Sequence, residues 1–361
     1  MTSPRASRHP AATHPTPPAD ATQQLEVVSR PPVIRAIAPP ALGALTVVAV
    51  MASLVVGDRS ISPGTVVDAL LSTDMSVIDH QVVWGSRVPR TVAGVAVGAA
   101  IAVAGALVQA LTRNPLADPG ILGVNAGAAV AVAAGVSLLG IGGMQGQLWC
   151  AVIGAFIATV AVLAIGAAGR GGADPIRLTL AGVAFAAVMT GLTTAITLLD
   201  VRAFDAMRTW SAGSLAVRGI GPTLQALPFV AIGLLAAAAA ARYLSSIALG
   251  DDLATTLGVP LLRARLLGIL GITTACGAAT AIAGPIGFVG LMVPHIIRWI
   301  VGPHQGWILG LSALAGPCLI LGADVLARVA TPGGMPVGVV TAFLGAPVLI
   351  AMVRTRAVSG L

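Results

Sequence analysis

Long apolar runs separated by short polar segments repeat along the 361-residue chain. A transmembrane helix needs roughly 20 consecutive, mostly apolar residues, so the apolar length predicts about ten such helices. The runs lie near residues 36–57, 91–111, 119–141, 148–168, 178–199, 223–241, 263–284, 286–301, 307–327 and 337–353. The pattern therefore predicts an all-α, polytopic membrane protein.

The most informative interruption lies between the second and third runs, where residues 105–127 read GALVQALTRNPLADPGILGVNAG. This segment places Arg113, Asn114 and Asp118 between two spans, together with helix-limiting residues such as Pro119. Backbone there cannot face lipid with unsatisfied polar groups, so it must meet water or be covered by other helices. Interrupted spans of this kind are typical of membrane proteins that move solutes.

Composition agrees with a membrane protein and excludes one enzymatic role. The chain is 57% hydrophobic and only 9% charged, whereas about a quarter of a soluble domain is charged. All 20 basic residues are arginine. Because a P-loop needs its lysine to reach the nucleotide phosphates, this chain cannot be its own Walker-type ATPase. Cys150, Cys276 and Cys318 lie in apolar runs without metal-ligand spacing, which favours buried small hydrophobic groups.

The chain consists of two segments that differ in composition. Residues 1–34 are rich in proline and lack an early apolar stretch, which predicts a disordered cytoplasmic tail rather than a secretory signal. Residues 35–361 form the predicted transmembrane domain. With ten spans that start inside, both termini are cytoplasmic and 13 arginines fall inside against seven outside, as the positive-inside rule expects. The outer seven are Arg59, Arg87, Arg90, Arg202, Arg208, Arg218 and Arg328.

Charge is almost absent from the span centres; Asp324, near an outer end, is the exception. Proton- or sodium-coupled transporters usually carry ionisable residues at mid-membrane, so their absence disfavours that class. His295 and His304 stand nine residues apart without a nearby carboxylate or thiol, which argues against a metal site. No nucleophile motif occurs in the chain, so we expect no catalytic residues and no cofactor.

Three arginines near the outer ends of spans invite a specific interpretation. Arg87 and Arg90 are three residues apart before the second span, and Arg328 follows Asp324 by four residues. These side chains either snorkel at the lipid interface or form a cationic rim that receives an acidic partner, since arginine pairs well with carboxylates.

The longest polar segment on the inner side, residues 242–265, has leucines at helical spacing. Asp251 and Asp252 suit the N-terminus of a short helix, and Gly250 and Gly258 mark breaks on either side of it. The segment is either a solvated loop or one or two amphipathic helices that dock into a partner's groove.

Several long motifs together resemble the FecCD family. They are RVPRTVAGVAVGAAIAVAGALVQALTRNPLADPGILGVNAGA, WSAGSL, LGDDLATTLGV, GPIGFVGLMVPHIIR and PVGVVTAFLGAPV, in the family's order over residues 36–354. That family comprises membrane permeases of ABC importers for ferric siderophores, haem and vitamin B12. The resemblance implies the type II ABC importer permease fold.

The resemblance also implies partners and roles. A second permease subunit, two cytoplasmic ATPase subunits, an extracytoplasmic solute-binding protein and membrane lipid are expected as partners, and nucleic acid is not. Arg87, Arg90 and Arg328 match the arginines that dock the binding protein. The inner segment matches the helices that couple to the ATPase, through Gly250, Asp251, Asp252, Ala254, Leu257 and Gly258.

Some assignments stay open within this resemblance. Candidates for lining the translocation path are Thr190, Thr193, Thr194, Thr197 and Thr341, but span threonines often satisfy backbone carbonyls instead. The chain departs from many relatives at Gly334-Met335-Pro336 and at Val348-Leu349. A ferric siderophore is the expected cargo, with vitamin B12 or haem as the alternative. A secondary transporter without an ATPase, and a membrane scaffold, are the alternatives of other classes.

Overall fold

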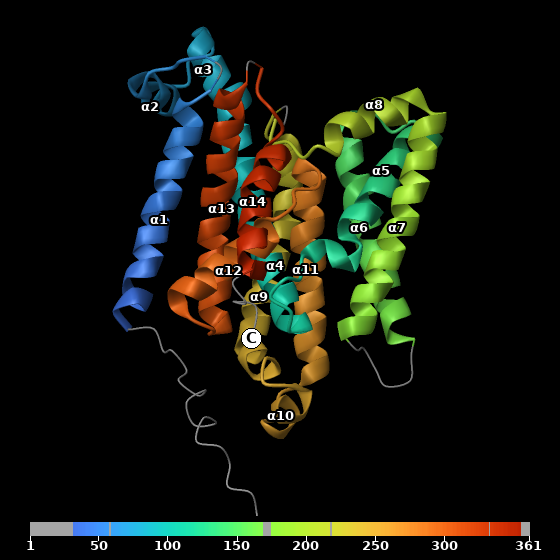
Figure 1. Cartoon of the computed structure of the whole chain (residues 1–361). Helices are drawn as coiled ribbons and strands as arrows, with labels where there is room; N and C mark the ends of the chain where they lie inside the picture. The colour runs from blue at the N-terminus through green and yellow to red at the C-terminus, as the bar shows by residue number, and fades with distance from the viewer. Residues whose placement is uncertain (1–31, 58, 169–174, 217–218, 332, 355–361) are drawn as a thin grey trace, which may run out of the picture.

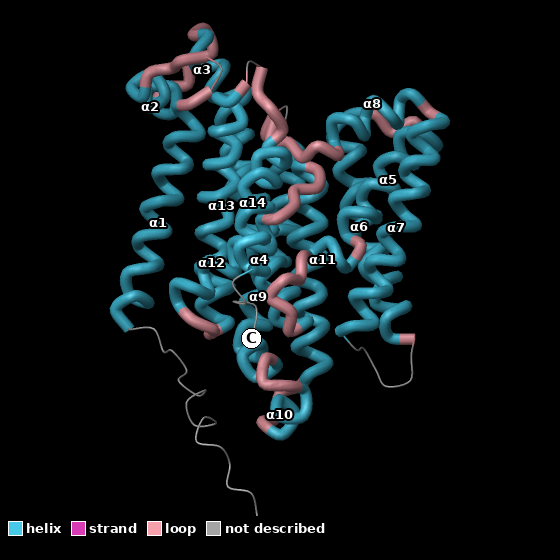
Figure 2. Tube along the Cα trace, in the orientation of Figure 1, coloured by secondary structure: helices cyan, strands magenta, loops and turns pink. Residues whose placement is uncertain are grey.

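The computed structural model describes residues 32–57, 59–168, 175–216, 219–331 and 333–354, and these contain helices but no strand (Figures 1 and 2). The α-helices are α1 (Pro32–Val55), α2 (Pro63–Leu71), α3 (Ile78–Val82), α4 (Val88–Thr112), α5 (Val124–Leu139), α6 (Gly143–Ala167), α7 (Pro175–Leu199), α8 (Val201–Trp210), α9 (Gly221–Ile247), α10 (Asp251–Thr256), α11 (Leu261–Ala283), α12 (Val289–Val301), α13 (Gln305–Ala330) and α14 (Val337–Arg354). A π-helical turn, η2 (Val83–Arg87), precedes α4, and a 3-10 turn, η3 (Pro119–Leu122), precedes α5. The predicted all-α class is confirmed.

Seven described helices are long and apolar enough to cross a membrane, and α5, α12 and α14 are shorter apolar helices in the three remaining predicted runs. The 13 residues of α12 extend about 20 Å at about 1.5 Å per residue. That length is less than a hydrocarbon core of about 30 Å, so α12 cannot cross alone. The short helices α2, α3 and α8 were not predicted, because hydropathy detects only spans. The expected tail lies outside the described residues except for positions 32–34, which belong to α1.

Helix α4 lies at the centre of the bundle. It buries 19 of its 25 residues and packs against α9, α11, α12 and α13. By contrast, only 6% of the most apolar window of α7 is buried. In Figure 1, α1 lies on one side of this centre and the group α5 to α8 lies on the other. The exposed apolar faces of α1 and α7 are therefore available to lipid or to another subunit.

Close backbone contact holds α4 against α12. A Cβ atom placed on Gly105 would lie 1.8 Å from the carbonyl oxygen of Gly290. Small residues at such crossings let helices in lipid approach closely. We therefore expect Gly105→Ala to destabilise the protein by about 1–3 kcal/mol through overpacking. Gly322→Ala on α13 is the matched control, since a Cβ there meets nothing within 4 Å. Equal thermal stability of the two variants in detergent would contradict this packing.

The predicted break after α4 is present and is covered by the bundle. Arg113 ends α4 with φ of 51°, and the Asp118 carboxylate accepts a hydrogen bond from the Gly120 N–H at 2.8 Å. The turn packs against α12, because a Cβ on Gly290 would lie 3.0 Å from Cδ of Pro119. Helix α5 starts at Val124, later than the apolar run predicted, because the residues before it form this capped turn.

A second interruption is stabilised by a side chain from α4. Pro294 lies inside α12 and has no N–H to donate to the carbonyl of Gly290. The Gln109 amide Nε2 donates to the carbonyl oxygens of Gly290 and Leu291, at 3.2 Å each. An unsatisfied carbonyl in a membrane interior is costly, so Gln109 compensates for the proline.

Candidate functional site

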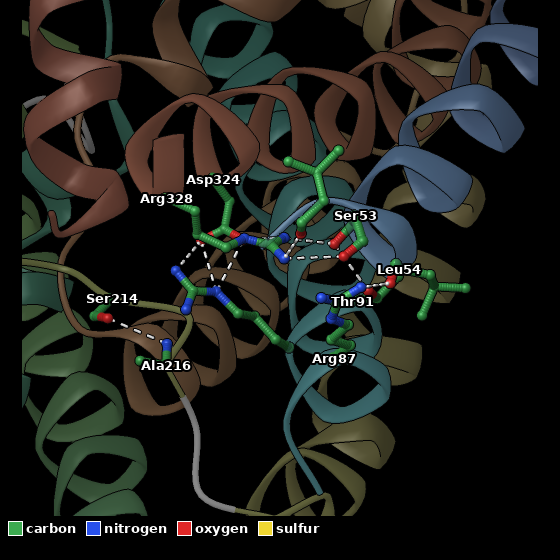
Figure 3. Close-up of polar contacts among 10 residues, drawn as sticks. Ser53, Leu54, Arg87, Thr91, Ser214, Ala216, Asp324 and Arg328 are labelled. Atoms are coloured by element: carbon green, nitrogen blue, oxygen red, sulfur yellow. Dashed lines mark hydrogen bonds and ion pairs between the residues drawn. The ribbon is translucent and has the colours of Figure 1, made fainter. Parts of the chain in front are cut away.

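The outer arginine cluster comprises Arg87, Arg90, Arg328 and Asp324 and joins α1, α4 and α13. Figure 3 shows Arg87, Arg328 and Asp324 beside Ser53 and Leu54 at the end of α1. Arg87 Nη1 donates to the carbonyl oxygens of Leu54 and Val55 at 2.6 Å each. The last carbonyls of a helix lack intrahelical partners and carry partial negative charge, which favours cations there. Arg87 therefore caps the C-terminus of α1.

Arg328 caps the same helix end from α13. Its Nη1 donates to the carbonyl oxygens of Ser53 at 2.9 Å and Val56 at 2.7 Å. Its Nη2 donates to the Ser53 hydroxyl at 2.8 Å and to the Asp324 carboxylate at 2.7 Å. The Arg328–Asp324 pair at i and i+4 agrees with the sequence spacing.

Asp324 also binds Arg90 in a two-pronged ion pair. Arg90 Nη2 lies 2.7 Å from Asp324 Oδ1, and Arg90 Nε lies 2.9 Å from Oδ2. The Asp324 side chain is fully buried, whereas that of Arg90 is 17% exposed. Two guanidinium groups thus share one buried carboxylate, which ties α4 to α13.

Two of the three arginines expected to form a cationic rim are buried. Arg87 is 3% exposed and Arg328 is 7% exposed, because both side chains turn inward to the end of α1. Of the three, Arg90 is the most accessible, with 17% of its side chain exposed. A docking role for these arginines stays a prediction.

At the opposite end of the bundle, the expected short inner helix is present as α10. Gly250 precedes it with φ of 112°, a backbone conformation that favours glycine. Ala254 is buried, while Leu249, Leu253 and Leu257 are 62%, 56% and 64% exposed. Of the three leucines, only Leu253 lies within α10, while Leu249 and Leu257 flank it. A short helix in this segment is confirmed as α10, although the spaced leucines do not form one helical face, and its coupling role stays a prediction.

Asp251 faces the bundle and binds two arginines, an arrangement called here the Asp251 bridge. Arg113 Nη2 lies 2.9 Å from Asp251 Oδ1, and Arg265 Nη2 lies 2.6 Å from Oδ2. Arg113 ends α4 and Arg265 lies in the first turns of α11. Asp252, in contrast, is exposed and makes no ion pair within the described part of the chain. Asp251 and Asp252, which were expected to share one role, therefore have different surroundings. Past them, Gly258 ends the segment with φ of 76°.

Most of the candidate path threonines use their hydroxyls on backbone. Thr193, Thr194 and Thr197 donate to carbonyls of their own helix, α7, at 2.8–2.9 Å. Thr341 is fully buried and donates to the Gly338 carbonyl at 3.0 Å. Thr190 is exposed on α7. The alternative of backbone satisfaction is thus realised for four of the five, and path lining stays a prediction.

Sequence reasoning did not assign Arg113 or Arg265 a functional role. Their partner Asp251 is 138 residues from Arg113 and 14 residues from Arg265. The first separation is too long for any local pattern and the second crosses the break at Gly258 between α10 and α11, so spacing offered no signal. Asp324 was noticed as a charge in a span, but its pairing with Arg90 spans 234 residues and was equally invisible.

Comparisons with known proteins agree with this architecture. The chain is 48% identical over 332 residues to the ferric enterobactin transport system permease protein FepD of Escherichia coli, covering 91% of this chain and 98% of FepD. It is 39% identical to the cobalamin import system permease protein BtuC of Halobacterium salinarum, covering 78% of this chain and 76% of BtuC. An ABC transporter assigned to the metal-chelate type, solved in an inward-facing conformation, superposes with a TM-score of 0.74 at 25% identity. That match covers 87% of this chain and 97% of the solved one.

The profile of the FecCD transport family matches residues 45–355, which is most of the transmembrane domain. Proteins of this family are ABC transporter permeases, which are transport components rather than enzymes and which work with ATPase and partner subunits. The apolar helices and these relatives make the chain a membrane protein. The chain belongs to the FecCD transport family.

Proposed function

We propose that this chain is the permease subunit of an ATP-driven importer for a ferric siderophore. The observation that carries the proposal is the 48% identity to FepD over nearly the full length of both chains. ATP hydrolysis takes place on separate subunits, because this chain has no lysine for a P-loop.

The proposed complex contains a second permease subunit, two cytoplasmic ATPase subunits and an extracytoplasmic binding protein in a cell membrane. Both termini lie in the cytoplasm in this arrangement, which agrees with the arginine bias. The largely unburied α7 offers an apolar face for lipid or for the second permease subunit. The exposed leucines in and beside α10, Leu249, Leu253 and Leu257, offer an apolar surface to a groove on an ATPase subunit.

The alternative cargo within the family is vitamin B12 or haem. The relatives include BtuC, named for cobalamin, and the hemin transport system permease protein HmuU of Yersinia pestis, 39% identical over 269 residues. Both identities are lower than that to FepD, so the siderophore remains the first choice. A secondary transporter is the alternative of another class, and dependence of uptake on an ATPase partner separates the two.

Uptake of radiolabelled ferric siderophore and cobalamin tests the cargo. Cells that lack this chain are compared with the same cells carrying it on a plasmid. Loss of ferric siderophore uptake alone, restored by the plasmid, is the expected result. Loss of cobalamin uptake instead would keep the importer and replace its cargo. Uptake that continues after removal of the ATPase partner would overturn the ATP-driven mechanism.

Docking of the binding protein is proposed to use Arg90 directly, with Arg87 and Arg328 holding the end of α1 in place. We expect Arg90→Gln to weaken binding of the loaded binding protein by about tenfold, because one charge-assisted contact is worth about 1.5–3 kcal/mol. The matched control is Arg202→Gln, an exposed arginine of α8 outside the outer arginine cluster. Surface-immobilised binding protein at low salt provides the measurement. Similar affinities for both variants would remove Arg90 from the docking site.

A further inference from the structure

A cavity of about 520 Å³ lies at the junction of α6, α8 and the end of α11. Its lining residues are Met144, Gln147, Arg208, Thr209, Trp210, Ala212, Ser214, Ala216, Ala281, Ile282, Ala283, Gly284 and Pro336. The volume lies within the range of about 300–1,000 Å³ that is usual for small-molecule sites. The cavity is thus large enough for a compact ligand.

The wall formed by residues 210–214 is fixed by backbone contacts. The Ser214 N–H donates to the Ala283 carbonyl at 2.7 Å, and the Gly338 N–H donates to the Gly213 carbonyl at 3.0 Å. Gly284 has φ of 72°, and a Cβ there would lie 2.1 Å from the Trp210 carbonyl oxygen. This close approach requires glycine. The wall is therefore formed by backbone contacts of the fold itself and needs no ligand.

Arg208 and Ser214 supply hydrogen-bond donors to the cavity, Gln147 can donate and accept, and the Thr209 hydroxyl donates to the Ala206 carbonyl. Arg208 is the only charged residue among the described residues of the lining, and a guanidinium cannot accept a hydrogen bond. The Trp210 indole N–H has almost no accessible surface, so it does not open onto the cavity although its residue lines it. The Ser214 oxygen accepts from the Ala216 N–H at 3.1 Å, so its proton remains available to donate. Such a set suits an anion or an oxygen-rich ligand.

Arg208 differs from its neighbour Arg202 on the same helix. Arg202 is bound by Asp200, whose pKa is lowered to about 2, first by the side-chain hydrogen bond from Arg202 and then by the backbone N–H of that residue. Arg208 makes no ion pair within the described part of the chain, although Asp205 lies three residues before it. The guanidinium that lines the cavity is therefore not neutralised by its own helix.

The cavity also adjoins the outer arginine cluster. Pro336 lines the cavity, and the neighbouring Met335 N–H donates to the carbonyl of Ala327 at 3.0 Å. Ala327 directly precedes Arg328 on α13. A ligand released by a protein docked at this end would have a short route to the cavity.

We propose that this cavity is a reception pocket for an anionic metal chelate, with Arg208 as its charge-bearing contact and the Ser214 hydroxyl as a second donor. The proposal rests on the importer function proposed above and adds a place and a charge preference for the cargo. The apolar stretch Ala281–Ala283 faces the less polar part of the chelate. An anionic phospholipid headgroup shares this chemistry, and the experiment separates the two sources.

The test uses the complete transporter, permease with its ATPase subunits, in nanodiscs of zwitterionic lipid. Equilibrium binding is measured for a radiolabelled anionic ferric tricatecholate and an uncharged ferric trihydroxamate. We expect Arg208→Gln to weaken tricatecholate binding by about tenfold, the scale of a charge-assisted contact, and to leave trihydroxamate binding unchanged. Ser214→Ala, which removes the hydroxyl, should show a smaller loss of the same kind. Arg202→Gln, which does not line the cavity, should match the wild type.

Three outcomes would overturn the proposal. Arg208→Gln could bind the tricatecholate as tightly as the wild type, or it could lose both chelates equally, as a purely structural defect would. In the third outcome, the wild type loses its preference for the tricatecholate in phosphatidylglycerol nanodiscs, and Arg208→Gln is insensitive to this lipid. That result would identify a lipid headgroup as the occupant of the cavity. If the wild type imports chelate but Arg208→Gln keeps its charge preference, only the cavity proposal fails. If the wild type neither binds nor imports any ferric chelate, the proposed function fails with it.

Discussion

A transporter carrying Asp251→Asn is expected to import at least about tenfold less cargo per ATP hydrolysed than the wild type, the equivalent of about 1.4 kcal/mol. Asp251 accepts from Arg113 at 2.9 Å and from Arg265 at 2.6 Å, so one carboxylate fastens α10 to both α4 and α11. An uncharged amide cannot hold two guanidinium groups in this way. Movement of an ATPase against α10 would then no longer be passed to α4, the central helix of the bundle.

The control for this prediction is Asp252→Asn, which makes the same charge change one residue away at an exposed position without an ion pair in the described structure. It should couple nearly as well as the wild type. Asp251→Glu keeps the charge and should restore much of the coupling. Cargo uptake and ATP hydrolysis are measured together in proteoliposomes with the binding protein present. Equal ratios for Asp251→Asn and Asp252→Asn would show that the bridge plays no part in coupling.

Replacement of Asp324 by asparagine is expected to have the largest effect on stability, a loss of about 3 kcal/mol or more. Its side chain is fully buried and pairs with both Arg90 and Arg328 at 2.7 Å. Removal of the carboxylate leaves the guanidinium groups of Arg90 on α4 and Arg328 on α13 without their shared counter-ion, and a buried charge without its partner is costly. The end of α1 should loosen as well, because Arg328 also caps it.

Asp79→Asn is the matched control, since Asp79 pairs with Arg59 at 2.7 Å but both side chains are partly exposed. Exposed pairs contribute about 0–1 kcal/mol, so little loss is expected there. Unfolding of the two variants in the same detergent provides the measurement. The double variant Arg90→Met/Asp324→Leu should recover part of the loss, because it removes one charge together with the carboxylate. If Asp324→Asn is as stable as Asp79→Asn, the outer arginine cluster does not hold α1, α4 and α13 together.

Local features of the chain were sufficient to predict several elements. Apolar length predicted the spans, because each must bury its backbone within the hydrocarbon core. The proline- and glycine-containing segments near residues 113–123 and 284–288 predicted interruptions, since these residues limit helices. The leucine spacing before residue 258 predicted α10. Each of these signals lies within a few residues of sequence.

Which way a span faces could not be predicted in the same manner. The spanning helices are apolar on nearly all sides, so periodicity does not distinguish a lipid-facing side from a packed one. As a result, α4 and α7 look alike in sequence, yet α4 is almost entirely buried and α7 is open. The inward orientation of Arg87 and Arg328 was missed for the same reason, because it depends on where the end of α1 lies.

The sequence by itself determined the class of the protein, the approximate spans, the breaks and the family. The tertiary structure alone decided that Asp324 joins Arg90 to Arg328, that Asp251 joins Arg113 to Arg265, and that Arg208 lines a cavity rather than a flat surface. The physical reason is separation along the chain. A helix or turn arises from residues close in sequence, whereas an ion pair across 138 or 234 positions forms only when packing brings its helices together.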